Sequence, residues 1–290
     1  LLKIKRIIYS FFHSSHPVFK KKNYFLNQFL EKTKGYNNKA IDFSEGLTTG
    51  NFNGKNFLIN FKPGDFMESA IYTDGCWERH ITTLISQALN KSSGIMLDIG
   101  ANIGLNTIPL AVEHNNIKFY CYEPHPILFH RLKNNIKLNK LRNVSAINCA
   151  LSDSKEDNLT FYAQKNSSNM GLSSLRLNPD IEEYYEITTP INAIDKIFKD
   201  SSETVSVIKI DTQGEETAII KSAIQTIERD RPVVFFEFED AYYSDNDRES
   251  SKKFLESFFK QMDYSLFNIT SGSNYYPKID IRQVYKGDIL

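Results

Sequence analysis

The sequence predicts an α/β protein with a mostly parallel sheet covered by helices on both faces. From residue 95 onward, short apolar segments of strand length alternate with amphipathic segments of helical length. Such alternation requires crossover connections, and these produce a parallel sheet with helices on both faces. One departure is expected at the C-terminal end, where Tyr264–Thr270 and Ile279–Val284 flank a turn containing Ser and Gly. That pattern predicts a hairpin, which adds an antiparallel strand.

Five segments have the length and apolar character of buried strands. They are Ile95–Ile99, Ile117–Tyr122, Val144–Leu151, Val205–Ile210 and Val233–Phe238. Apolar residues that recur every three or four positions predict helices between them. The predicted helices are Leu105–His114, Ile127–Leu138 and Thr217–Ile227, with a further one earlier over Tyr72–Leu89.

The composition is that of a globular protein without overall charge. Of 290 residues, 41% are apolar and 24% are charged, and 35 basic residues balance 35 acidic ones. This balance argues against a large nucleic-acid footprint. Three widely spaced cysteines predict buried free thiols in a reducing compartment. We therefore expect a cytoplasmic protein.

The first 70 residues are expected to form an extension ahead of a main domain over residues 71–290. Residues 1–30 carry basic side chains and no acidic ones, namely Lys3, Lys5, Arg6, Lys20, Lys21 and Lys22. This basic helical arm either contacts a membrane surface or acidic partner, or packs on the domain as a solvated helix. Its longest apolar run, Ile7–Phe12, is too short for a signal-peptide core or a membrane span. Asn53-Gly54 between two β-prone runs predicts a hairpin after the arm.

A long polar stretch, Ser152–Pro190, separates the third and fourth predicted strands. It holds one β-prone run, Leu159–Tyr162, but no clear core pattern. A segment of this length is more often a lid or binding loop than a linker.

A glycine-containing turn between a buried strand and a helix predicts a small-molecule site at residues 98–104. Gly100 allows a sharp turn and a close approach to a ligand, and the helix after Gly104 begins with free N–H groups. Glu123 ends the next strand, 19 residues after Gly104, where a carboxylate accepts both hydroxyls of a ribose. The pairing indicates an adenosine moiety.

The same turn argues against a nicotinamide cofactor. The dinucleotide fingerprint needs glycines at 102 and 105, where this chain has Asn102 and Leu105. Asp98 would also repel a pyrophosphate, whereas it suits the ammonium group of a methionine moiety. The charge pattern thus favours S-adenosylmethionine.

Several motifs in order carry a family resemblance. They are Asp98-Ile-Gly-Ala-Asn-Ile-Gly104, Tyr122-Glu-Pro-His-Pro126, Asn134-Asn-Ile-Lys-Leu-Asn139, Ala150-Leu-Ser-Asp153 and Lys209-Ile-Asp-Thr-Gln-Gly-Glu-Glu216. Across residues 70–240 the chain resembles the FkbM family of S-adenosylmethionine-dependent methyltransferases. The resemblance implies a class I methyltransferase (Rossmann-like) sheet with an antiparallel last strand. It also implies O-methylation of a hydroxyl on a sugar, glycan or natural product.

By motif match, the resemblance implies a cofactor site. Asp98, Gly100 and Asn102 would line the methionine end, Glu123 the ribose, and Leu151 with Ser152 the adenine. The matched turns also contain Ala101, Gly104, Pro124 and Asp211. Gln213 stands where many members carry Glu, so no role is implied for it.

Carboxylates at the ends of the fourth and fifth strands are expected beside the methyl group. Asp211 could act as the base or hydrogen-bond acceptor for a substrate hydroxyl. Alternatively, Asp211 with Glu237 or Asp240 could hold Mg²⁺, which would ease deprotonation. His80, on the helix before the glycine turn, is a further candidate base or else a surface residue.

Three rival functions stay open at this level. A nucleotide-dependent oxidoreductase or epimerase is disfavoured by the missing glycines. A nucleic-acid methyltransferase is disfavoured because neither an Asn-Pro-Pro-aromatic turn nor a Pro-Cys nucleophile occurs. A non-catalytic binding module of the same fold is the third. We expect a small-molecule or carbohydrate acceptor and no nucleic acid; the oligomeric state is not predicted.

Overall fold

The computed structural model describes residues 46–61, 67, 71, 74–164, 173–176, 183–239, 242–269 and 286–289. The chain divides into two compact units, residues 1–45 and 46–290. The predicted basic arm lies outside the described residues. The division groups the predicted hairpin with the main domain rather than with the arm. No helix in the described part of the chain has the length and apolar character that a bilayer crossing requires.

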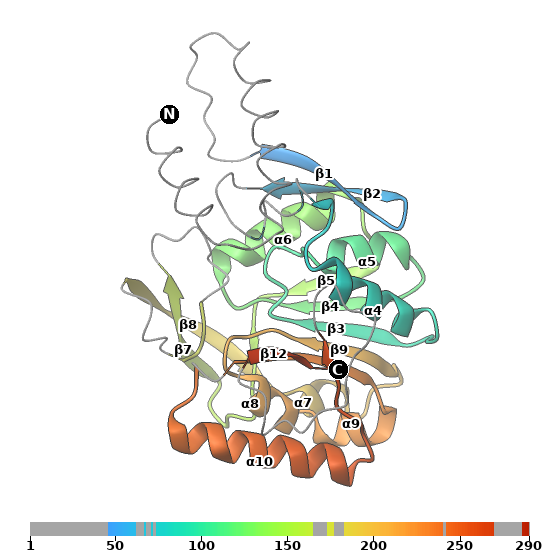
Figure 1. Cartoon of the computed structure of the whole chain (residues 1–290). Coiled ribbons are helices and arrows are strands. Elements are labelled where there is room, and N and C mark those ends of the chain that lie inside the picture. The colour runs from blue at the N-terminus through green and yellow to red at the C-terminus, as the bar shows by residue number, and fades with distance from the viewer. Residues whose placement is uncertain are drawn as a thin grey trace, which may run out of the picture. The chain divides into compact units, whose positions relative to one another are not determined.

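A seven-stranded sheet forms the centre of the second unit (Figure 1). Its order is β11-β12-β10-β9-β3-β4-β5. The strands are β3 (Ile95–Ile99), β4 (Phe119–Tyr122), β5 (Val144–Ile147), β9 (Val205–Ile210), β10 (Val233–Glu239), β11 (Asn268–Ile269) and β12 (Lys286–Ile289). Strands β3, β4, β5, β9 and β10 are parallel, and β12 runs antiparallel to β10. This confirms the predicted fold class, although Ile279–Val284 lies outside the described residues.

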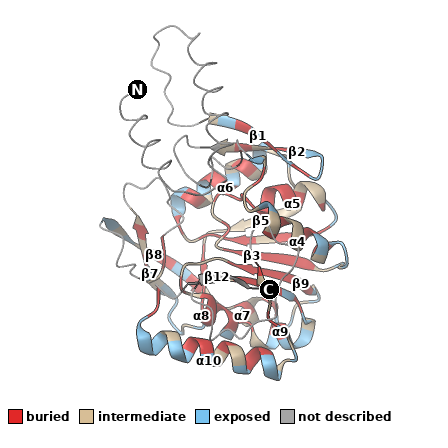
Figure 2. Cartoon of the chain, viewed as in Figure 1, coloured by how far each residue is buried: buried red, intermediate tan, exposed pale blue. Residues whose placement is uncertain are grey.

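Helices cover both faces of this sheet. On one face lie α4 (Arg79–Leu89), α5 (Thr107–Glu113) and α6 (Pro126–Leu138); on the other lie α7 (Ile194–Phe198), α8 (Glu216–Lys221), α9 (Ile224–Asp230) and α10 (Asp245–Gln261) (Figure 1). Side chains of β3 alternate between the two apolar layers, with Leu97 and Ile99 in one and Met96 in the other. The sheet is therefore buried on both faces (Figure 2).

Three predicted elements have different boundaries in the structure. The third predicted strand is split, because β5 ends at Ile147 and β6 (Ala150–Leu151) joins another sheet. The predicted helix over Thr217–Ile227 is two helices, with Ser222 at the break donating to the Ile219 carbonyl. The predicted helix Tyr72–Leu89 has its long regular part only from Arg79, after Glu78 takes a positive φ of 39°.

A second sheet, in the order β6-β8-β7, contains much of the stretch predicted as a lid. Here β7 (Asn158–Gln164) pairs antiparallel with β8 (Tyr184–Asn192). The polar composition conceals this sheet because only one of its faces is buried. Phe161 and Ala163 point to that face and are almost wholly buried.

The predicted hairpin is confirmed and rests on α6. It consists of β1 (Gly46–Phe52) and β2 (Lys55–Phe61), joined by Asn53 and Gly54 with φ of 47° and 78°. Both values suit the two-residue turn that matches strand twist. Asn139 of α6 accepts from the Leu58 N–H at 2.8 Å and donates to the Leu58 carbonyl at 2.7 Å. Such contacts occupy the free edge of β2, which is otherwise a template for unwanted strand pairing.

The three cysteines, Cys76, Cys121 and Cys149, are buried free thiols, as predicted.

Candidate cofactor and acceptor site

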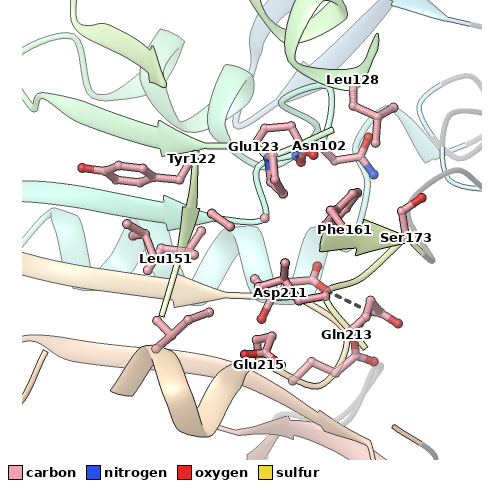
Figure 3. A pocket seen from close by; sticks show the side chains of 18 of the residues that line it. Asn102, Tyr122, Glu123, Leu128, Leu151, Phe161, Ser173, Asp211, Gln213 and Glu215 are labelled. Atoms are coloured by element: carbon pink, nitrogen blue, oxygen red, sulfur yellow. Dashed lines mark hydrogen bonds between the residues drawn. The ribbon is translucent and has the colours of Figure 1, made fainter. Parts of the chain in front are cut away.

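A cavity opens at the carboxyl ends of β3, β4, β9 and β10, where parallel sheets bind ligands. Asn102 and Glu123 lie along one side of it, and Asp211, Gln213 and Glu215 along the other (Figure 3). It is the location that the glycine turn predicts.

The turn after β3 needs glycine at 100 because two strands meet there. Gly100 has a φ of 79°, and a Cβ on it would lie 1.9 Å from the Asp211 carbonyl oxygen. Asn102 also takes a left-handed conformation, with a φ of 53°. Asn tolerates this region better than most residues. The chain therefore achieves at Asn102 a backbone geometry usually associated with glycine.

Glu123 is buried at the end of β4, with 4% of its surface exposed. Its Oε2 accepts from the Asn102 N–H at 2.7 Å, and its Oε1 from the His125 N–H at 2.9 Å. Burial raises its pKa to about 7, although these two hydrogen bonds lower it in part. Each oxygen keeps a lone pair for a further donor. The group therefore fits a pair of ribose hydroxyls.

Asp98 lies beneath the cavity rather than in its lining. It is 1% exposed, and its Oδ2 accepts from Thr107 Oγ1. Lys209 Nζ lies 3.7 Å from Asp98 Oδ1 and 3.2 Å from Asp211 Oδ2. Burial would lower the pKa of Lys209, but Asp211 and Asp98 raise it, so the ammonium stays charged. A buried cation thus links the first motif, through Asp98, to the last, through Asp211.

The other residues predicted for the cofactor divide into two groups. Gly100, Asn102, Glu123, Pro124, Leu151 and Asp211 line the cavity. Ala101, Gly104 and Ser152 are not among its described lining residues, and Gly104 instead packs against Ile108 and Leu132. His80, the alternative base, is also not among them.

Asp211 faces the cavity from the end of β9, and a quarter of its side chain is exposed. Burial raises its pKa, but the charge of Lys209, together with side-chain hydrogen bonds involving Lys209, Gln213 and Glu237, outweighs burial and lowers it. Gln213 Nε2 donates to Asp211 Oδ1 at 3.2 Å and to Glu237 Oε2 at 3.0 Å. Asp211 is therefore an ionised hydrogen-bond acceptor at neutral pH.

A buried carboxylate fixes the turn that carries Asp211 and Gln213. Glu216 Oε1 accepts from the backbone N–H of Thr212 at 3.4 Å and of Gly214 at 3.1 Å. Its Oε2 accepts from the Tyr243 hydroxyl at 2.8 Å. Burial raises the pKa of Glu216, and these donors offset part of the rise. Glu216 thus fixes this turn through contacts within the protein, without a ligand.

The second sheet contacts the start of α6 through His125. Its Nδ1 accepts from the Ile127 N–H at 3.2 Å, which caps the helix. Its Nε2 lies 3.4 Å from the Tyr185 hydroxyl, and Phe161 packs edge-on to the ring. Burial lowers the pKa of His125 to about 4, so the ring is neutral and Nε2 carries the proton.

Several lining residues carry no predictive signal in the sequence. Phe161 reaches the cavity from β7, and Ser173 and Leu175 reach it from a segment bridged to β7 through Ser174. Only Phe161, inside a β-prone run, could have been selected by pattern. Trp77 and Glu78, from the segment before α4, also line it.

The predicted magnesium set of Asp211 with Glu237 or Asp240 stays a prediction, because one of its members is not described. Asp240 lies outside the described residues, and no three His, Cys, Asp or Glu side chains in the described part cluster as metal ligands. Between Asp211 and Glu237 stands the Gln213 amide, which presents N–H groups rather than an oxygen lone pair.

A glycine turn, a ribose-type carboxylate after the next strand and an antiparallel last strand together define a class I methyltransferase site. The chain belongs to the FkbM methyltransferase family, whose domain model matches residues 98–266, more than half of the chain. The residues that line the cavity fit S-adenosylmethionine, the cofactor that the sequence predicts.

Individual relatives share shorter segments with this chain. The 31-O-demethyl-FK506 methyltransferase FkbM of Streptomyces tacrolimicus is 29% identical over 105 residues, 36% of this chain and 38% of that protein. A tRNA(Phe) (4-demethylwyosine(37)-C(7)) aminocarboxypropyltransferase of Methanocaldococcus jannaschii is 36% identical over 77 residues, 27% of this chain and 30% of that one. The structure of M. jannaschii TYW2 in complex with AdoMet has 14% identity and a TM-score of 0.41 over 85% of this chain and 83% of that chain. The match thus spans about a third of the length of these two curated relatives.

Proposed function

We propose that this methyltransferase acts on oxygen, transferring the methyl group to a hydroxyl of a sugar, glycan or other small natural product. The observation that carries the proposal is Asp211, an ionised carboxylate that faces the cofactor cavity and is braced by Lys209 and Gln213. A braced carboxylate is an acceptor for a substrate O–H.

The residues have separate tasks in this reaction. S-adenosylmethionine supplies, when bound, a methyl group on a sulfonium leaving group. Glu123 holds the ribose, and Asp211 accepts a hydrogen bond from the acceptor hydroxyl. On methyl transfer, Asp211 would take the proton of the acceptor hydroxyl and release it to water.

Orientation contributes more to the rate than base strength in this arrangement. The lowered pKa of Asp211 makes it a weak base. Alignment of reactants can supply about 7–11 kcal/mol, whereas a general base adds about 10² to 10⁴ in rate. We therefore assign Asp211 chiefly to aligning the hydroxyl, with proton removal late in the step.

The test is a screen of hydroxylated sugars and natural products with radiolabelled S-adenosylmethionine, followed by Asp211→Asn on any acceptor found. We expect kcat to fall about 10²- to 10⁴-fold. The Kd for S-adenosylmethionine should change little, because the amide keeps the shape. Methylation at nitrogen or carbon, or full activity of Asp211→Asn, would refute the proposal.

A second candidate is modification of RNA, because one relative is named as acting on tRNA. The cavity argues against it. Its described lining contains five carboxylates and no Lys, Arg or His, namely Glu78, Glu123, Asp211, Glu215 and Glu237. A phosphate backbone needs basic partners.

A further inference from the structure

The most specific contact that the proposed reaction leaves unused is the side chain of Gln213. One amide nitrogen donates to two carboxylates from different strands, to Asp211 at 3.2 Å and to Glu237 at 3.0 Å. All three side chains line the cavity.

The backbone at Gln213 is fixed for this task. Its φ is 58°, in the left-handed region that is unfavourable for a non-glycine residue. Its carbonyl oxygen accepts from Ser174 Oγ at 2.7 Å, and the next N–H, of Gly214, is held by Glu216. These contacts fix the backbone at Gln213, from which the side-chain amide reaches the two carboxylates.

Two carboxylates that face one cavity repel each other unless a proton, a cation or a hydrogen-bond donor lies between them. We propose that Gln213 is a positioning residue whose amide joins Asp211 and Glu237 into one acceptor-facing pair and takes the place that a divalent cation would fill. The orientation of the amide follows from charge, because the flipped form would set its oxygen against two carboxylates.

An amide and a cation are alternatives at these two oxygens. An ion shared by Asp211 Oδ1 and Glu237 Oε2 would compete with the Gln213 amide for the same two oxygens. The amide nitrogen of Gln has no lone pair available for a metal. The pair therefore works without a divalent metal, and a carboxylate at position 213 would convert it into three oxygen ligands.

The inference rests on the proposed function for its catalytic meaning, because the pair matters only if it orients an acceptor hydroxyl. Whether the Gln213 amide takes the place of a divalent metal does not depend on the acceptor. Binding of a metal ion and binding of the cofactor can both be measured without an acceptor, and both report on the pair of Asp211 and Glu237.

The experiment compares the full-length wild-type protein with Gln213→Glu, Gln213→Leu and the control Gln87→Glu. Gln87 is an exposed residue of α4, so the substitution Gln87→Glu adds the same negative charge away from the cavity. Each protein is titrated with MnCl₂ and, separately, with S-adenosylmethionine by calorimetry. For any acceptor found, kcat and KM are measured with and without a chelator.

We expect no saturable Mn²⁺ binding up to about 1 mM for wild type and Gln87→Glu, and saturable binding at least about tenfold tighter for Gln213→Glu. Gln213→Leu should bind S-adenosylmethionine normally, with kcat reduced about 10- to 100-fold and KM for the cofactor unchanged. Chelator should leave the wild-type rate intact.

Saturable Mn²⁺ binding by the wild-type protein would overturn the inference. So would a Gln213→Glu variant that binds S-adenosylmethionine but gains no metal site, or a Gln213→Leu variant with unchanged kcat. If no hydroxyl is ever methylated, the proposed function fails while the Mn²⁺ titrations still decide this inference.

Discussion

The pKa of Glu123 makes cofactor binding sensitive to pH at the scale of a single residue. Burial raises that pKa to about 7 from its ordinary value of 4.5. The protonated form is therefore favoured in the folded protein, and its stabilising contribution is present below pH 4.5 and lost as the pH rises through about 7. The ribose hydroxyls need the ionised form as their acceptor.

Affinity for S-adenosylmethionine should therefore rise with pH up to about 7 and then level off. Below that pKa, we expect the Kd for S-adenosylmethionine to change by up to about tenfold per pH unit. Calorimetric titrations from pH 5.5 to 8.5, in buffers of different ionisation enthalpy, should show proton release at the lower values. Glu123→Gln should bind more weakly with no such dependence, and an unchanged slope in that variant would assign the titration to another group.

Lys209 provides a stability prediction at the same scale. It is 5% exposed and lies between Asp98 and Asp211. Lys209→Met would leave these two carboxylates without their cation. Removal of one member of a buried ion pair costs about 3–5 kcal/mol, so the melting temperature should fall by many degrees.

The matched control is Lys118→Met. Lys118 pairs with Glu203 at 2.6 Å, but its side chain is 65% exposed. Exposed pairs contribute little, so its melting temperature should stay close to wild type. Equal losses in the two variants, measured by thermal unfolding, would contradict the buried role of Lys209.

At the scale of elements, the structure gives a role to two asparagines of the motif Asn134–Asn139, at the end of α6. Asn135 Oδ1 accepts from the Asn60 N–H at 2.8 Å and its Nδ2 donates to the Ile103 carbonyl at 2.8 Å. Asn139 binds both backbone groups of Leu58. The motif joins three elements that are distant in sequence: hairpin, glycine turn and helix.

Asn139→Ala should loosen the hairpin. It leaves the Leu58 N–H and C=O without these partners, so we expect a loss of about 1–3 kcal/mol in the free energy of unfolding, measured by urea denaturation. Asn134→Ala, one turn away with an exposed contact to His130, should change stability by less than about 0.5 kcal/mol. Hydrogen exchange should accelerate at the β2 amides in the first variant only.

At the scale of the whole molecule, charge is distributed unevenly although the formal net charge is zero. The cavity carries carboxylates, and the described residues that line it include no basic side chain. Like charges repel strongly in a cavity with low-dielectric walls. The acceptor should therefore be neutral or cationic near the methylated hydroxyl.

Acceptors that differ only in charge test this expectation. For a hydroxyl compound that is methylated, we expect kcat/KM to fall at least about tenfold when a phosphate is attached beside the hydroxyl, equivalent to about 1.4 kcal/mol. An amino substituent at the same position should not cause this loss. A phosphorylated acceptor that outperforms its neutral parent would place an anion site in the cavity.

The sequence by itself determined the order of strands and helices and the position of the cofactor turn. Apolar periodicity is a local property, so Ile95–Ile99 and Val205–Ile210 coincide with β3 and β9. The glycine turn and Glu123 are recognisable because a sharp turn and a ribose each demand a particular residue type at a particular spacing.

Tertiary structure alone decided which residues beyond those motifs share the cavity and how their charges are balanced. Lys209 stands in an apolar strand pattern, and only its burial between Asp98 and Asp211 explains a charge there. Gln213 and Glu237 are separated by a helix pair, and the parallel pairing of β9 with β10 brings the turn after β9 close to Glu237 of β10. Long-range contacts of this kind depend on strand register and side-chain direction, which no local pattern encodes.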